Sequence, residues 1–141
     1  MRTSMILLVS LLTGLVVLGC GEEPASTQPT APTLDSIQQT VFEESCNFDT
    51  CHSANGGSGG LVLESDVARD QLVDVEPMNA AAAGAGLLRV KPGSPDESLL
   101  LIKLEAGVPS EFGDRMPRFS SGLPADQLAA IRTWIDEGAQ E

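Results

Sequence analysis

The stretch Cys46-Asn47-Phe48-Asp49-Thr50-Cys51-His52 (CNFDTCH) holds two of the three cysteines of the chain and its single histidine. With only one histidine, the chain cannot build an HExxH zinc site, a two-histidine carboxylate iron site or a Cys₂His₂ finger. Nothing in the sequence pairs two carboxylates on a recognisable catalytic scaffold, and we expect no hydrolytic enzyme. Any chemistry is therefore expected to centre on this stretch.

A cysteine followed directly by a histidine is the core of a c-type haem attachment motif. In that motif two thiols bind the haem vinyl groups as thioethers, and the adjacent imidazole becomes an axial ligand of the iron. Four residues separate Cys46 from Cys51, whereas the usual motif has two. Because the additional residues can be looped out, we predict one covalent haem c on Cys46 and Cys51, with His52 on the iron.

Length and charge set further limits. The chain has 141 residues, which is the size of one domain. Its 8 lysines and arginines against 20 acidic residues give a net charge of −12. Binding to nucleic acid or to an anionic lipid surface needs clustered cations, so this charge argues against both. We interpret the acidic residues as a solvated surface that favours a partner with a basic docking face.

The N-terminus has the pattern of a bacterial export signal: Arg2, a short apolar run and small residues before Cys20. Val17-Leu18-Gly19-Cys20 resembles the lipobox of bacterial lipoproteins, in which the cysteine is lipidated. We predict a signal peptide over residues 1–19 and a lipid anchor on Cys20, with the periplasmic face of the outer membrane as the expected location because Gly21 follows. Residues 20–33 are rich in Pro and Thr and are expected to form a disordered tether.

Residues 34–141 are predicted to form one mostly α domain. Apolar periodicity indicates helices over 34–46, 66–73 and 124–137. A further helix is expected around 94–102, where Ser94, Pro95 and Glu97 have the pattern of a capping box. The Gly- and Ala-rich stretches 55–60 and 78–86 are expected to be loops.

In the order of its motifs, this domain resembles the small c-type cytochrome domains of exported bacterial lipoproteins, some of which carry the widened CxxxxCH motif. The matching segments are, in chain order, Phe42 to His52, Gly59-Gly60-Leu61, Val90 to Leu104, Met116-Pro117 and Ile131 to Ala139. The resemblance implies a class I cytochrome c-like fold, about four helices around one haem with long Gly/Ala-rich loops.

The resemblance also implies that Met116 is the second axial ligand of the iron. A residue before proline is biased toward an extended conformation, so Met116 is expected on a non-helical stretch. Met78 and an open sixth position are the alternatives for that ligand. We expect the haem to fill a core poor in large apolar side chains, packing against Phe42, Leu61, Leu100, Phe119 and Trp134.

The function implied is that of a periplasmic or outer-membrane electron carrier, which passes electrons to a redox partner protein and is not an enzyme. The alternative is a haem-free binding or scaffold lipoprotein in which Cys46 and Cys51 form a disulfide in an oxidising compartment. Zinc is a poorer candidate, because Cys46, Cys51 and His52 offer three ligands with no evident fourth.

Overall fold

The computed structural model describes residues 29–141, so the predicted signal peptide and Cys20 lie outside the described part of the chain. The described residues are mostly helical and contain no strand beyond two isolated parallel bridges, Val73 with Val90 and Leu88 with Ser98. The predicted mostly α class is confirmed at this level. Within residues 29–141, none of the helices has the length and apolarity to cross a membrane.

The first helical segment leads directly to the cysteine–histidine stretch. It consists of α1 (Leu34–Ile37), a π-helical turn (Gln38–Phe42) and α2 (Glu43–Ser45), and it ends at Cys46. The predicted helix over 34–46 is therefore present, with a π-helical turn that periodicity did not indicate. Ile37, Val41 and Phe42 are buried along it. This packing anchors the beginning of the motif.

Two short helices follow. The predicted helix over 66–73 is present as α3 (Ala68–Leu72). The stretch 78–86, expected to be a loop, contains α4 (Ala80–Gly84). The Asn79 side chain caps α4 by accepting a hydrogen bond of 2.9 Å from the backbone N–H of Ala82. An Asn cap ahead of four alanines is a good helix start, and this signal outweighs the loop interpretation.

The predicted capping box at Ser94 is wrong. Residues Pro95–Glu97 form a 3₁₀ turn, the Ser94 side chain caps nothing, and α5 (Leu99–Leu104) begins only after Ser98. Ser98 is buried and extended, and its hydroxyl accepts from the N–H of Lys91 and donates to the carbonyl of Ser94, both at 2.9 Å. These bonds hold the backbone at Ser98 out of the helix, so α5 starts one turn late.

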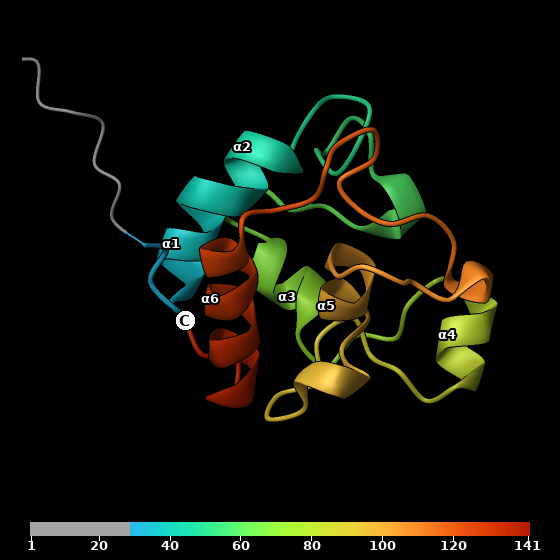
Figure 1. Cartoon of the computed structure of the whole chain (residues 1–141). Helices are drawn as coiled ribbons and strands as arrows, with labels where there is room; N and C mark the ends of the chain where they lie inside the picture. Colours follow the sequence, from blue (N-terminus) through green and yellow to red (C-terminus); the bar gives the residue numbers. More distant parts are fainter. Residues whose placement is uncertain (1–28) are drawn as a thin grey trace, which may run out of the picture.

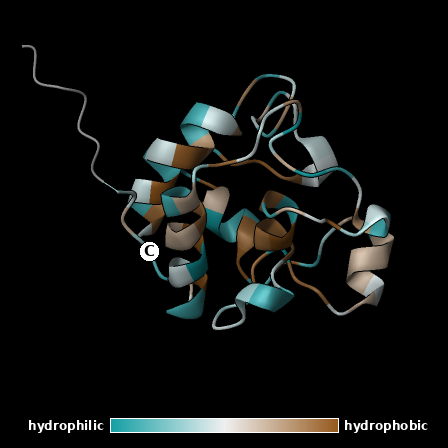
Figure 2. Cartoon of the chain, viewed as in Figure 1, coloured by the Kyte–Doolittle hydropathy of each residue, from teal (hydrophilic) through white to brown (hydrophobic). Residues whose placement is uncertain are grey.

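The last helix, α6 (Ala125–Asp136), matches the prediction for 124–137. It ends before Gly138, whose φ of +101° is readily available only to glycine. Figure 1 shows α6 beside α1, close to the C-terminus of the chain. In Figure 2, α5 is one of the most hydrophobic segments. The core cluster is made of Ile37, Val41, Phe42, Leu63, Ala68, Leu72, Val90, Leu101, Leu104, Ile131, Trp134, Ile135 and Ala139.

Candidate functional site

An apolar cavity of about 280 Å³ lies between the cysteine–histidine stretch and α5. Its wall combines the end of the first helical segment, the loops around residues 58–63 and 77–79, α5, and the stretch from Phe112 to Met116. The apolar side chains on this wall include Leu61, Leu63, Leu72, Leu99, Leu100, Leu104 and Phe112. Leu99 and Leu100 stay only partly buried because they face this space rather than packed protein.

The widened motif forms a closed loop. The backbone N–H of His52 donates to the carbonyl of Cys46 at 3.2 Å, and the N–H of Cys51 donates to the carbonyl of Phe48 at 2.8 Å. Phe48, Asp49 and Thr50 are exposed on the outside of this loop. The additional residues between the two cysteines are thus accommodated on the surface, while Cys46 and His52 both line the cavity.

Gly56 packs tightly against the backbone of the motif loop. A Cβ atom at Gly56 would lie 2.7 Å from the carbonyl oxygen of Asp49 and from both the nitrogen and the carbonyl oxygen of Cys51. All three neighbours are backbone atoms, which cannot move without reshaping the loop. The chain at Gly56 can therefore lie this close to the backbone of Asp49 and Cys51 only because Gly56 has no side chain.

The His52 ring is held in one tautomer. Its Nδ1 lies 3.2 Å from the carbonyl oxygen of Leu61. A carbonyl oxygen only accepts, so Nδ1 carries the proton and Nε2 keeps its lone pair. Nε2 has no hydrogen-bond partner among residues 29–141. A hydrogen-bonded Nδ1 with an available Nε2 is the arrangement found in metal-ligating histidines.

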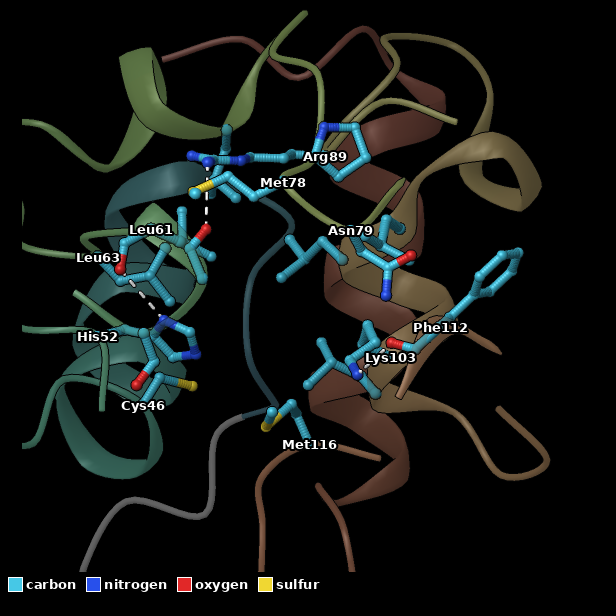
Figure 3. Close-up of a pocket in the computed structure, with 17 residues that line it drawn as sticks. Cys46, His52, Leu61, Leu63, Met78, Asn79, Arg89, Lys103, Phe112 and Met116 are labelled. Atoms are coloured by element: carbon cyan, nitrogen blue, oxygen red, sulfur yellow. Dashed lines mark hydrogen bonds between the residues drawn. The ribbon is translucent and has the colours of Figure 1, made fainter. Parts of the chain in front are cut away.

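Met116 lines the same cavity as His52 and Cys46 (Figure 3). It occupies a non-helical stretch, as predicted, and its N–H donates to the carbonyl of Lys103 at 2.7 Å. The Met116 side chain is partly buried against the core cluster. Met78 also reaches the cavity wall, but its side chain is 72 % exposed. Of the two thioethers, Met116 is the more firmly positioned.

Cys46 and Cys51 are both free thiols, and no disulfide joins them within the described residues. Burial, and to a smaller extent the nearby Cys51, raise the pKa of the Cys46 thiol to about 12. Cys46 is therefore a protonated thiol at neutral pH. Cys51 is half-buried beside the motif loop but is not part of the cavity wall.

Only part of the expected haem contact set surrounds the cavity. Leu61 and Leu100 line it, whereas Phe42 and Trp134 are buried in the core cluster away from the wall. The expectation for Phe119 is wrong: its side chain is 100 % exposed, with the Arg118 guanidinium 5.2 Å from its ring centroid. Phe119 has a φ of +61°, a turn conformation that directs its side chain to the surface.

The sequence did not indicate several of the cavity residues, among them Phe112, Lys103 and Arg89. Phe112 and Lys103 stand in an irregular stretch and a helix, where no pattern indicated which side they would face. Arg89 had a signal, because it is a lone cation within the apolar run 87–90. It is buried, with 8 % of its surface exposed.

The donor set is compatible with a haem: the wall of the apolar space carries an imidazole, a thioether and the Cys46 thiol, and the second thiol, Cys51, lies in the same loop beside His52. By contrast, residues 29–141 contain no group of three His, Cys, Asp or Glu side chains placed to hold a metal ion by themselves. Comparison with protein-family models, with curated proteins and with solved structures finds no match to the chain.

Proposed function

We propose that this protein is a single-haem c-type electron carrier whose residues 34–141 form a class I cytochrome c-like domain. One observation carries the proposal: the His52 ring, held through Nδ1 by Leu61, shares an apolar cavity with Cys46 and Met116. A helical domain around such a cavity is compatible with this fold. The widened motif supports it as well, because its additional residues lie on the outside of a closed loop.

Cys46 and Cys51 would attach the cofactor. Each thiol would add across a vinyl C=C bond of the haem, its sulfur forming a C–S bond and its hydrogen going to the neighbouring vinyl carbon. The addition consumes no oxidant and requires free thiols, which both cysteines have. A disulfide between Cys46 and Cys51 would prevent it.

His52 and Met116 would hold the haem iron, His52 through the lone pair of Nε2 and Met116 through its sulfur. Haem supplies one-electron chemistry, with iron alternating between the ferric and ferrous states. Thioether ligation by Met116 favours the ferrous state and raises the reduction potential. Leu61, Leu99 and Leu100 give this space an apolar lining. With the haem bound, the domain would accept one electron from a reduced donor protein and pass it to an oxidised acceptor protein.

The net charge and the predicted N-terminal signal support a class of partner and a location for this carrier. A net charge of −12 favours a redox partner with a basic docking face. The predicted export signal and lipid anchor on Cys20 support a location on the periplasmic face of the outer membrane, held there by the lipid anchor alone. No nucleic acid is expected among its partners.

The test is expression of the full chain in a bacterium that matures c-type cytochromes. We expect the wild type to give a haem-stained band on a denaturing gel and a reduced cytochrome spectrum. The Cys46→Ala/Cys51→Ala double variant should give an immunoblot signal of the same size without the stain. An unstained wild type would refute the proposal, and a disulfide in that protein would favour the haem-free scaffold lipoprotein instead.

A further inference from the structure

Arg89 is a buried cation on the wall of the cavity, and no acidic side chain within residues 29–141 forms an ion pair with it. Among the described residues, Lys91, Arg118 and Arg132 form ion pairs with acidic side chains, and Arg89 forms none. The chain has 20 acidic residues, so acids are not scarce. The lack of an ion pair at Arg89 therefore reflects the surroundings of this residue and not a shortage of acidic residues in the chain.

Neutral oxygens hold the Arg89 guanidinium in place. Nη1 donates to the backbone carbonyl of Gln71 at 2.9 Å and to its side-chain Oε1 at 3.2 Å. Nη2 donates to the carbonyls of Gly60 at 3.0 Å and of Gly59 at 3.4 Å. The Nε–H, the fifth donor of the group, has no partner among residues 29–141. The head group is thus oriented along the cavity wall (Figure 3) while its charge stays uncompensated.

An uncompensated buried charge is costly in a folded protein. Burial lowers the pKa of Arg89 from its ordinary value. Arginine nevertheless stays protonated at any physiological pH, so it cannot escape this cost by losing its proton. A cation kept at this cost, and fixed by several hydrogen bonds, indicates that an anion occupies the neighbouring space when the site is filled.

A second cation, Lys103, lines the same cavity. Its Nζ donates to the carbonyl of Phe112 at 2.9 Å, and it also forms no ion pair among the described residues. Burial lowers its pKa, an effect that Asp114 opposes. The remaining titratable side chains on the wall are Cys46 and His52. The wall therefore carries positive charge and no carboxylate, in a strongly acidic protein.

We infer that Arg89 is the counterion for the carboxylate side chains of the bound haem, with Lys103 as a secondary cation. The inference rests on the proposed function. Apart from its iron, haem is a large apolar ring with two carboxylate groups, which matches an apolar cavity with two unpaired cations. Arg89 is suited to this role because its charge is permanent and its Nε–H has no partner among residues 29–141, whereas Nη1 and Nη2 already donate to Gln71, Gly60 and Gly59.

Arg89 then tunes the cofactor as well as binding it. A positive charge beside the ring favours the ferrous state, which carries one less positive charge. In an apolar cavity a carboxyl group tends to keep its proton, and a nearby guanidinium opposes this by stabilising the carboxylate. Loss of Arg89 should therefore lower the reduction potential at neutral pH and move the ionisation of the haem carboxyl groups to higher pH.

The test is a redox titration of the holoprotein between pH 5 and 9 for wild type, Arg89→Gln, Arg89→Lys and Arg132→Gln. Arg132 is the matched control, since it carries the same charge but pairs with Asp96 and Glu105 and does not line the cavity. For Arg89→Gln we expect a lower reduction potential at pH 7. We also expect the range in which the potential changes with pH to move to higher pH. Arg89→Lys should recover most of the wild-type curve. Stained holoprotein in which the Arg89→Gln and Arg132→Gln curves superimpose would overturn the assignment while leaving the proposed function intact.

A second measurement keeps the test decisive if Arg89→Gln fails to accumulate. In wild-type holoprotein carrying ¹³C-labelled haem carboxyl groups, infrared difference spectra should show ionised carboxylates at pH 6 to 7. A labelled band of the protonated acid in this range would show that no cation stabilises the carboxylates, and it would refute the role of Arg89. A wild type without haem would refute the proposed function and this assignment together.

Discussion

The His52 ring donates through Nδ1 to the carbonyl of Leu61, nine residues further along the chain, at 3.2 Å. The backbone is fixed at the same place, because the N–H of Leu63 donates to the carbonyl of His52 at 2.7 Å. One segment therefore sets both the tautomer and the position of the imidazole. His52 is a pre-oriented ligand at the edge of an apolar cavity.

Replacing His52 by alanine should remove one axial ligand while leaving the cavity in place. We expect His52→Ala holoprotein to lose its low-spin spectrum and to regain it when imidazole is added. Thr50→Ala, an exposed position in the same loop, is the control and should keep the wild-type spectrum. An unchanged spectrum in His52→Ala would contradict the assigned role.

The two methionines on the cavity wall can be separated by matched substitutions. Met116→Leu keeps a similar volume but removes the sulfur, so we expect a lower reduction potential and a changed spectrum. Met78→Leu removes the same atom from a side chain that is 72 % exposed, and it should leave both unchanged. The reverse result would assign the ligand to Met78, and no effect in either variant would indicate an open sixth position.

Gly56→Ala should damage the motif loop, because the new Cβ would meet three backbone atoms at 2.7 Å. Such overpacking typically costs about 1–3 kcal/mol of unfolding free energy. The matched control is Gly84→Ala, where a Cβ meets nothing within 4 Å at the end of α4. Alanine is the better helix former, so this control should be neutral or slightly stabilising. Equal denaturation midpoints for the two variants would contradict the tight approach at Gly56.

The buried Cys46 thiol makes the stability of the haem-free protein depend on alkaline pH. Its pKa is raised from 9.0 to about 12, so between these values the folded state holds a proton that the unfolded state has lost. The stabilisation is present below pH 9 and is lost as the pH rises toward 12, by at most about 1.4 kcal/mol per pH unit. Denaturant unfolding of wild type and Cys46→Ala should show a shallower decline for the variant. Parallel curves would mean that the folded protein does not hold the Cys46 proton.

Docking to a basic redox partner should depend on salt. Opposite charges accelerate association, and ions screen this attraction. We expect stopped-flow electron-transfer rates with a basic test partner to fall as ionic strength rises. Rates that stay constant would show that the net charge of −12 does not steer docking.

Local sequence determined the mostly helical class, the first helical segment and α6, because these depend on apolar periodicity and on a terminal glycine at Gly138. It also indicated which residues carry the chemistry, since the chain has a single histidine. The start of α5 could not be read in the same way. The Ser98 hydroxyl accepts a hydrogen bond from the N–H of Lys91 and donates one to the carbonyl of Ser94. These bonds keep Ser98 extended, so the helix does not begin at the favourable capping pattern before it.

Tertiary structure alone decided what surrounds the candidate site. Phe42 and Phe119 are equally apolar, yet one is in the core and the other is fully exposed, because the backbone turns at Phe119. The bond between His52 and Leu61, the place of Met116 on the cavity wall and the surroundings of Arg89 likewise depend on segments brought together by folding. Sequence patterns record short-range preferences, whereas a cavity wall is assembled from residues far apart in the chain, and only the packed structure determines which of them meet.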